Sequence, residues 1–462
     1  MSTAAVAPPR GVFSREHLFV TLGMCALIGI AAFEQLAVTT VMPTVARQLH
    51  GEALYSLAFA APLATSVVGM VVAGNWADRS GPRVVVISSM ITFGCGLLIV
   101  AGSPTMEVLL IGRLVQGFGS GAMIVGLYVM VARLYPPELH PSVFAGFAAA
   151  WVIPGLVGPV IAGSVTQAFG WHWVFLGALA ACVPAVAMIA PSLGRVAGPA
   201  TAAGEERVPW SAGRILWSLA AAAAVVALNL LSEVPAWATV PVIVLAVALL
   251  AVALRPLLPR RALLAGAGVP TLVLLRGLVS AAFTGGDVYI PYLLSSLYGF
   301  GPAASGVTLT AGAVSWAFAS WVQGRLGPRP GQLRGIRIGV SLVVIGIAAA
   351  LATPLWHLTP GVIIVAWAVA GFGMGFMYPR FSVLTLRWSG DDEKGFNSSA
   401  LTISESSGGA VVLAVTGAAF GVLGGAGSPA AFVACFGVAG VFALVALGVS
   451  GRAVPRALRA TA

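Results

Sequence analysis

The sequence is dominated by uninterrupted apolar runs, each long enough to cross a lipid bilayer as a helix. A spanning helix needs about 20 mainly apolar residues. The runs lie at about 18–43, 54–76, 84–102, 107–132, 141–167 and 173–194, then 215–232 and 236–254, then 267–297, 303–323, 336–353, 359–381, 396–423 and 429–450. Only 8% of the 462 residues are charged, which is too few to cover a soluble protein of this length. We therefore expect an all-α membrane protein.

The order of the runs, six, then two, then six, predicts two related halves. A polar stretch at 195–214, with Glu205, Glu206 and Arg207, follows the first six. Two six-helix bundles related by an axis along the membrane normal are a known transporter plan. We predict fourteen transmembrane helices with pseudo-two-fold symmetry: an N-terminal bundle (1–194), a central loop with an inserted helix pair (195–266) and a C-terminal bundle (267–462).

The arginines support this count. With the N-terminus in the cytoplasm, 21 of the 24 basic residues fall in cytoplasmic segments, as expected from the positive-inside rule. Arg47 falls outside, and Arg113 and Arg276 fall within spans. The C-terminus is then cytoplasmic as well. The net charge of +10 is explained by membrane topology, and we expect no binding to nucleic acid because no basic face is present.

Several kinds of site are not predicted. The four cysteines lie inside apolar runs without a C-x-x-C pair, and the five histidines are scattered near the ends of runs, so we expect no metal site. Neither H-E-x-x-H nor G-x-S-x-G occurs, which disfavours a membrane-embedded enzyme. The sequence has no P-loop motif either, which disfavours ATP-driven transport. We expect no cofactor, with a proton gradient as the energy source.

The connection between the second and third runs reads GNWADRSGPR at residues 74–83. Gly74 and Gly81 let two helix ends approach closely. Asp78 can accept hydrogen bonds from a helix N-terminus, or pair with Arg79 or Arg83. An ordinary cytoplasmic turn is the alternative. At the equivalent place in the second half, QGRLGPR at 323–329 partly repeats this stretch but has no acidic residue.

Two further stretches lie inside runs. Residues 113–121 read RLVQGFGSG, in which the glycines favour close helix packing, whereas the charge of Arg113 within a span indicates function. Residues 154–163 read PGLVGPVIAG, in which Pro159 kinks the helix and Gly158 and Gly163 admit a neighbour. A generic proline–glycine kink is the alternative.

These stretches resemble motifs of the major facilitator superfamily: its G-x-x-x-D-R-x-G-x-R loop, its R-x-x-Q-G-x-G helix and the antiporter signature G-x-x-x-G-P-x-x-G-G. Pro154 and Ala162 stand where the last of these has glycine. GWHWVF at 170–175 resembles the G-W-R-W-x-F mark of the 14-span drug:proton antiporter branch, with His172 in place of arginine. The resemblance implies conformational gating by the loop and antiporter motifs.

Three acids fall within spans, and each is a candidate for proton coupling together with Arg113: Glu34, Asp287 and Glu405. Burial disfavours a charged carboxyl, and proton relays in pumps use such groups. Glu34 is the leading proton carrier; its alternative is a structural pair with Arg113, and both can hold. Asp287 is a candidate for substrate contact as well, and its alternative is a position near the outer mouth. The alternative for Glu405 is solvation near the inner surface. Arg276 has no clear partner in the sequence.

Polar residues beside these groups are candidates to line a substrate cavity. Gln35 follows Glu34, Gln116 is one turn from Arg113, and Tyr289 follows Asp287. Ser398, Thr402, Glu405 and Gly409 share one helical face, which should point toward the bundle interior or water.

The sequence therefore predicts a proton-coupled secondary-active exporter of lipophilic or amphipathic small molecules, of the multidrug-efflux type, working by alternating access. The alternatives are a dedicated metabolite or lipid exporter, an importer or a uniporter. We expect its partners to be a small-molecule substrate, protons and the bilayer. We expect a monomer in the cytoplasmic membrane of a bacterium.

Overall fold

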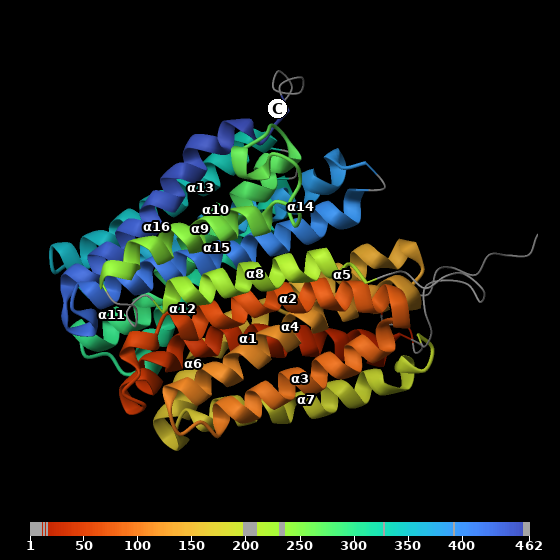
Figure 1. Cartoon of the computed structure of the whole chain (residues 1–462), viewed down its shortest axis with the longest axis horizontal. Helices are drawn as coiled ribbons and strands as arrows, with labels where there is room; N and C mark the ends of the chain where they lie inside the picture. Colours follow the sequence, from red (N-terminus) through yellow and green to blue (C-terminus); the bar gives the residue numbers. More distant parts are fainter. Residues whose placement is uncertain are drawn as a thin grey trace, which may run out of the picture.

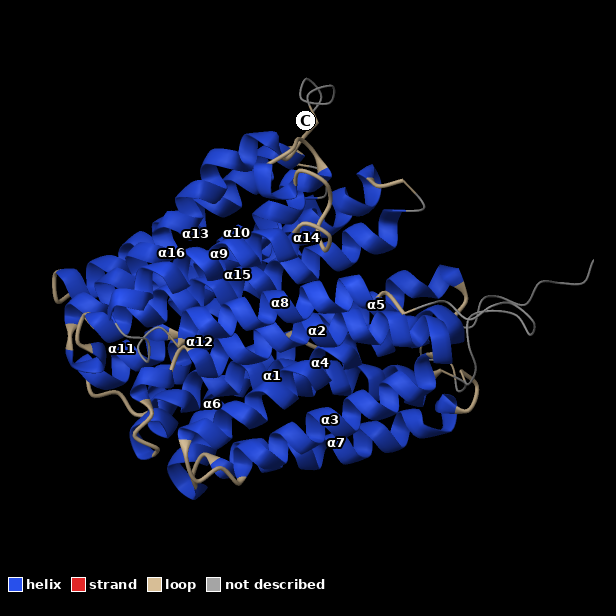
Figure 2. Cartoon of the chain, in the orientation of Figure 1, coloured by secondary structure: helices blue, strands red, loops and turns tan. Residues whose placement is uncertain are grey.

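The structure is a computed structural model that describes residues 12, 14, 17–196, 210–230, 236–326, 329–390 and 393–455. Its regular structure is helical, and these residues contain no strand (Figure 2). In lipid, every backbone N–H and C=O must be satisfied internally, and helices do this within one segment. The helices are α1 (Leu18–Gln48), α2 (Leu57–Ser80), α3 (Pro82–Ala101), α4 (Met106–Leu134), α5 (His140–Ala149), α6 (Val152–Phe169), α7 (His172–Leu193), α8 (Ala212–Asn229), α9 (Ala236–Leu254), α10 (Val269–Asp287), α11 (Tyr289–Leu297), α12 (Pro302–Leu326), α13 (Gln332–Leu355), α14 (Pro360–Trp388), α15 (Lys394–Val422) and α16 (Pro429–Val449).

Twelve helical segments of the described chain are long and apolar enough to cross a membrane. The helix α12 is not among them, and α9 contributes a shorter apolar stretch, Pro241–Leu254. The serines, threonines and glycines of α12 lower its hydropathy. The all-α membrane architecture is confirmed, whereas the count of fourteen crossings and the boundaries at 194/195 and 266/267 stay predictions. Most of the polar stretch between the halves, 197–209, lies outside the described residues.

Two of the predicted spans are each divided into two helices. The run at 141–167 is interrupted at Ala150 and Trp151, between α5 and α6. Pro154 has no N–H to bond the carbonyl of Ala150, so the helix is weakened at this point. The run at 267–297 is interrupted at Val288, where Pro291 likewise leaves the Asp287 carbonyl without its helical donor. Gly285 and Gly286 lie just before the second break.

Helices α1–α7 form one group and α10–α16 another, here called the first and second bundles (Figure 1). The bundles meet mainly where α2 packs against α15 and α6 packs against α12. In Figure 1 they converge toward the end that carries α11 and diverge toward the end that carries α5.

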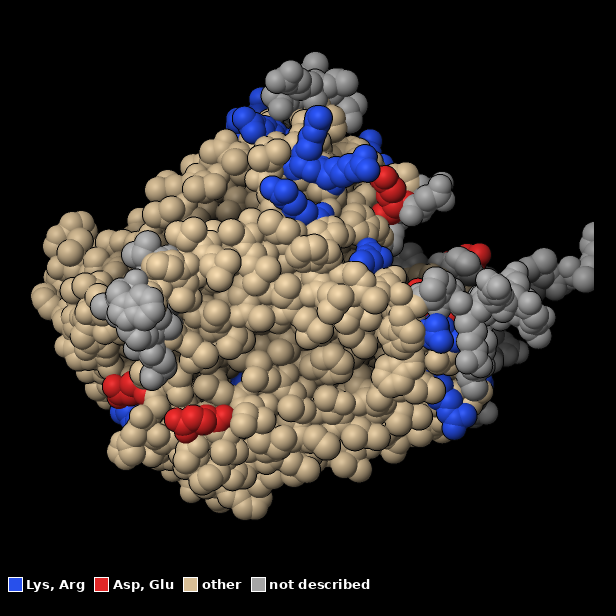
Figure 3. Space-filling view, viewed as in Figure 1, with Lys and Arg blue, Asp and Glu red and all other residues tan. Residues whose placement is uncertain are grey.

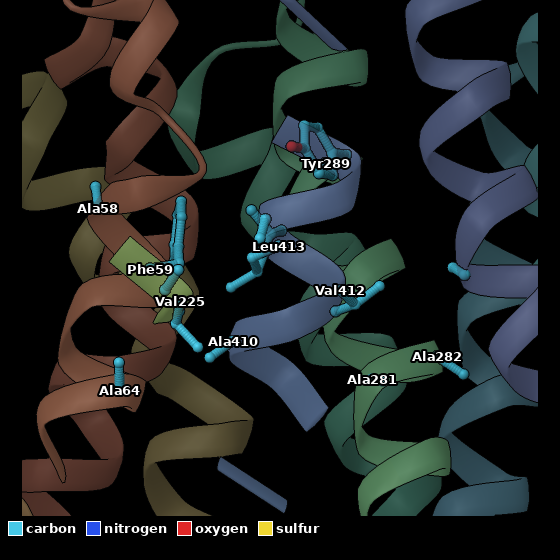
Figure 4. Close-up of a cluster of buried hydrophobic side chains, with 14 of the residues drawn as sticks. Ala58, Phe59, Ala64, Val225, Ala281, Ala282, Tyr289, Ala410, Val412 and Leu413 are labelled. Carbon is cyan, nitrogen blue, oxygen red and sulfur yellow. The ribbon is translucent and has the colours of Figure 1, made fainter. Parts of the chain in front are cut away.

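The helix α8 lies along the boundary between the bundles and contacts both α2 and α15, with α9 packed on it. It is hydrogen-bonded to α2 at both ends. Asn75 exchanges two hydrogen bonds with Ser211, of 3.1 and 3.4 Å, and Ser56 bonds Asn229 at 3.2 Å. Between these ends the contact is apolar, and Figure 4 shows Val225 of α8 beside Phe59 and Ala410. No hydrogen bond of this kind joins α8 to α15 within the described residues.

The charged residues divide the molecule into two unequal ends. In Figure 3 a broad uncharged band separates most of the blue side chains from the opposite end. The helix order places fifteen described arginines, from Arg79 to Arg452, at one end, which we call the arginine-rich end. The opposite, arginine-poor end carries Arg47 as its one described arginine or lysine.

The two bundles touch closely at the arginine-poor end. The hydroxyl of Tyr55, before α2, donates to the Val288 carbonyl at 2.8 Å, and the ring of Tyr55 lies 4.4 Å from that of Tyr292 on α11. Arg47 donates to the Ser295 hydroxyl at 3.3 Å. A Cβ on Gly163 of α6 would lie 2.6 Å from the Cα of Ala303 on α12. This end is therefore closed.

The contact at Gly163 yields a prediction. In Gly163→Leu the new side chain has no room against α12, so we expect the arginine-poor end to be forced apart. Spin labels at Ala53 and Ser296 should report a longer distance by double electron–electron resonance. Gly177→Leu on α7 is the matched control, because a Cβ there meets nothing within 4 Å. An unchanged distance in a folded Gly163→Leu protein would contradict a closed contact at this point.

Candidate functional site

A buried ion pair joins α1 and α4 inside the first bundle. The Arg113 guanidinium donates from Nη1 to Oε1 of Glu34, and the two side chains are 3% and 9% exposed. Arg113 also donates from Nε to the Ala58 carbonyl of α2 at 2.9 Å and from Nη1 to Oε1 of Gln116 at 2.8 Å. One guanidinium therefore ties three helices together, and the structural pair that the sequence left open is present.

The glycines of the fourth predicted span allow this arrangement. A Cβ on Gly119 would overlap the backbone of Phe93 on α3, and one on Gly121 would overlap that of Ser66 on α2. Helix axes in a membrane approach closely where such small residues face one another. The glycines of this motif thus pack α4 against α2 and α3, and its arginine supplies the charge.

A second ion pair lies in the second bundle. Arg276 of α10 donates from Nε and Nη2 to the same oxygen, Oε2 of Glu405 on α15, at 3.0 and 2.9 Å. Its Nη1 donates to Ser382 at 3.3 Å, and its Cζ lies 3.5 Å from the ring centroid of Tyr378 on α14. The side chains of Arg276 and Glu405 are 13% and 33% exposed. Glu405 is thus paired as well as partly accessible.

Asp287, the last residue of α10, has a different partner. It accepts a hydrogen bond of 2.8 Å from the indole Nε1 of Trp367 on α14. Phe283, one turn earlier, stacks on the same indole with ring centroids 4.6 Å apart. Asp287 therefore lies deeper than the Tyr292 and Ser295 contacts of the arginine-poor end, next to the break at Val288.

The four predicted cavity residues fall in different surroundings. Gln116 is buried against Arg113, and Tyr289 is buried in an aromatic cluster with Tyr55. Thr402 is partly buried on the polar face of α15. Gln35 is exposed, and its carbonyl accepts from Thr39 within the helix. The structure brings Gln116 to the first ion pair but does not bring Gln35, Tyr289 and Thr402 together.

The residues of the loop motif, which we predicted to take part in gating, gather at the arginine-rich end. Gly81 joins α2 to α3 with φ 83°, a conformation that glycine adopts without strain. Arg133 at the end of α4 attracts the Asp78 carboxylate, a cation that the sequence analysis did not consider. Arg79 lies over the ring of Trp210, 5.6 Å from its centroid, and Gly74 and Arg83 belong to the same corner.

The antiporter-like motif lies at the contact between bundles. Gly158 faces Phe33 of α1, and a Cβ on Gly306 of α12 would lie 2.8 Å from the Pro159 carbonyl. Pro159, Gly163 and Gly306 let α6 lie directly on α12, whereas Gly158 packs on α1 within the first bundle. Tight packing between the bundles is thus the role this motif has in the structure.

Some residues were missed by the sequence analysis. Charge balance alone does not identify the partner of Arg276, because both Asp287 and Glu405 are left over once Glu34 and Arg113 are paired. Tyr55, Trp316, Trp367 and Tyr378 carried no comparable signal, since aromatic residues are common in any spanning helix.

Residues 24–413 match the model of a single protein family, described as the Major Facilitator Superfamily. The chain belongs to this superfamily. The resemblance inferred from the loop and helix motifs is therefore confirmed.

Several curated superfamily members are similar to the chain over most of its length. The multidrug transporter protein MdtP of Bacillus subtilis is 25% identical over 422 residues, 88% of this chain and 76% of its own. A probable multidrug-efflux transporter of Mycobacterium tuberculosis is 26% identical over 388 residues, 81% of each chain. The MFS-type transporter ppz2 of Metarhizium majus is 25% identical over 415 residues, 86% of this chain and 70% of its own.

Solved structures share the fold. A POT family transporter in complex with 5-aminolevulinic acid superposes with a TM-score of 0.70 at 17% identity, covering 97% of this chain and 99% of its own. This chain and that transporter therefore have the same fold.

The Glu34–Arg113 pair yields a stability prediction for this superfamily member. In Arg113→Gln the carboxylate of Glu34 loses its counter-charge, and breaking a buried pair costs about 3–5 kcal/mol. We expect a clearly lower thermal midpoint, measured by the intrinsic fluorescence of the purified protein in detergent. The double variant Glu34→Gln with Arg113→Gln should recover part of the loss, because no charge stays buried. A double variant less stable than Arg113→Gln alone would contradict this view of the pair.

Proposed function

We propose that the chain is a proton-coupled antiporter that exports lipophilic or amphipathic small molecules across the cytoplasmic membrane. The observation that carries the proposal is the buried Glu34–Arg113 pair. A carboxylate that is nearly closed off from solvent and bonded to a guanidinium changes its interactions completely when it takes up a proton. The similarity to transporters named for multidrug efflux supports the substrate class.

The positive-inside rule supports the orientation. Loops that face the cytoplasm carry an excess of arginine and lysine, so the arginine-rich end is assigned to the cytoplasm, with both termini on that side. The closed arginine-poor end then faces outward. In this conformation the protein would be open toward the cytoplasm, from which an exporter takes its cargo.

The coupling step follows from the contacts of Arg113. When Glu34 is ionised, Arg113 is held between Glu34, Gln116 and the Ala58 carbonyl. A proton on Glu34 removes the charge attraction and leaves Arg113 bonded to α2 and to its own helix. Since α2 is also the helix that packs on α15 of the second bundle, the change reaches the contact between bundles. A proton thereby shifts the balance between two conformations that differ in affinity for it.

Replacing the proposed proton carrier tests this mechanism. In Glu34→Gln no group at this position titrates, so we expect uptake of ethidium into proteoliposomes driven by a pH gradient to fall at least about tenfold. Exchange of ethidium across the same membrane without a gradient should stay within about twofold, because it needs only alternation of the bundles.

Glu107→Gln is the matched control, since it removes a carboxylate from an exposed first turn of α4. Full gradient-driven uptake by Glu34→Gln would refute proton coupling through Glu34. Loss of exchange as well would show that Glu34 has a structural role instead. Drug susceptibility of cells that express the chain separates multidrug export from export of one metabolite, because the latter leaves susceptibility unchanged.

A further inference from the structure

The connection between α9 and α10, at the arginine-rich end, carries three arginines without a partner. Arg255, Arg260 and Arg261 are exposed, and none of them makes a side-chain hydrogen bond, ion pair or ring contact with a described residue. By contrast, Arg325 of α12 at the same end lies over the ring of Trp321, with Cζ 4.4 Å from its centroid. Figure 3 shows blue side chains gathered where Figure 1 places this connection. The positive-inside rule accounts for the side of the membrane but not for this local concentration.

The connection is fixed to the body of the protein. Leu257, Leu258 and Ala262 are buried in the hydrophobic core. The Thr271 hydroxyl of α10 donates to the Gly266 carbonyl at 2.6 Å. The backbone that carries the three arginines is therefore held in one arrangement, so a ligand that binds them need not order it first.

Two further exposed arginines lie on segments packed beside this connection. The Gly268 N–H donates to the carbonyl of Arg452 in the 3₁₀ helix η7 (Ser450–Arg452) at 3.0 Å. The same 3₁₀ helix contacts α13, and a Cβ on Gly451 would lie 2.9 Å from Nη2 of Arg337. Neither the connection, nor α13, nor η7 contains an aspartate or glutamate. We call the exposed arginines of these three segments the arginine cluster: Arg255, Arg260, Arg261, Arg337 and Arg452.

Two large apolar side chains are exposed in the same connection. Leu263 and Leu264, in the 3₁₀ helix η4 (Ala262–Leu264), are 40% and 77% exposed. Arg261 and Ala265 flank this helix with φ 65° and 51°, a region that residues with a Cβ rarely occupy, so the surrounding structure holds the turn in place. Leucines beside arginines suit the boundary between lipid headgroups and acyl chains, where the leucines enter the chains and the guanidinium groups stay among the headgroups.

We propose that the arginine cluster, with Leu263 and Leu264, is a binding site for an anionic phospholipid of the cytoplasmic leaflet. Guanidinium groups bind the phosphate of the headgroup through paired N–H donors, and the leucines contact its acyl chains. Basic clusters directly next to spanning helices attract anionic lipids in this way. The bound lipid fixes the connection between the inserted helix pair and the second bundle to the membrane. This inference is independent of proton coupling and of the cargo.

Two lipids with identical acyl chains separate headgroup charge from chain contact: dioleoyl phosphatidylglycerol, which is anionic, and dioleoyl phosphatidylcholine, which is zwitterionic. The dissociation constant of the first bound lipid is measured by native mass spectrometry on the delipidated full-length protein in detergent. We expect the wild-type protein to bind phosphatidylglycerol at least about tenfold more tightly, because several arginines act on one phosphate.

In the double variant Arg260→Gln with Arg261→Gln the affinity for phosphatidylglycerol should fall at least about fivefold, with that for phosphatidylcholine changed less than about twofold. Lysine at both positions should keep most of the preference, because the charge stays. The matched control is Arg325→Gln with Arg387→Gln, which removes the same charge from exposed positions of α12 and α14 at the same end. It should change both constants less than about twofold.

The remaining arms test the acyl chains. In Leu263→Ser with Leu264→Ser both affinities should fall by a similar factor, because the leucines contact the chains of either lipid. An excess of glycerophosphoglycerol, the same headgroup without chains, should not displace phosphatidylglycerol; displacement would assign the site to a soluble phosphodiester and overturn the proposal. Equal affinity of the wild-type protein for both lipids would also overturn it. So would an equal loss in the control variant, since charge anywhere at this end would then suffice.

Discussion

The need to balance charge inside lipid-bounded helices shapes the interior of this protein. Arg113 in the first bundle and Arg276 in the second are each bonded to a glutamate from another helix of the same bundle. Removing Arg113 would leave the buried carboxylate of Glu34 without its counter-charge, at a cost of about 3–5 kcal/mol. The pairs also fix which helices are neighbours, since Arg113 bonds groups on α1 and α2 while belonging to α4.

The arginine-poor end shows how a break in a helix can become a contact. Pro291 leaves the Asp287 carbonyl without its helical donor, and α10 is followed by α11 after Val288. The Val288 carbonyl at this bend accepts the Tyr55 hydroxyl from the opposite bundle. Asp287, which has no ion pair among the described residues, lies one residue before Val288, whose carbonyl joins the bundles. A change in the charge of Asp287 would therefore act close to the contact that closes this end.

The sequence predicts the architecture well because lipid permits few alternatives. Length and hydropathy locate the helices, and the glycine-rich motifs identify the close contacts of α4 and α6. The break at Ala150 was missed, since one proline at Pro154 does not reveal whether a helix bends or stops. The partners of Arg276 and Asp287 were also missed, because they depend on which helices of the second bundle are neighbours. Gln35 was predicted to line a cavity because it follows Glu34 in the sequence, although successive residues face different sides of a helix.

The helix α8 is attached to the two bundles in unlike ways. Asparagine and serine side chains bond it to α2 at both ends, whereas no such hydrogen bond joins it to α15 within the described residues, where Arg214 lies over the ring of Phe396. Helices without such bonds can slide over one another, whereas sliding α8 along α2 would break the Asn75–Ser211 and Ser56–Asn229 hydrogen bonds. If the two bundles move relative to each other, α8 and α9 should stay attached to the first bundle and slide along α15, so that the boundary between the bundles remains covered on this side.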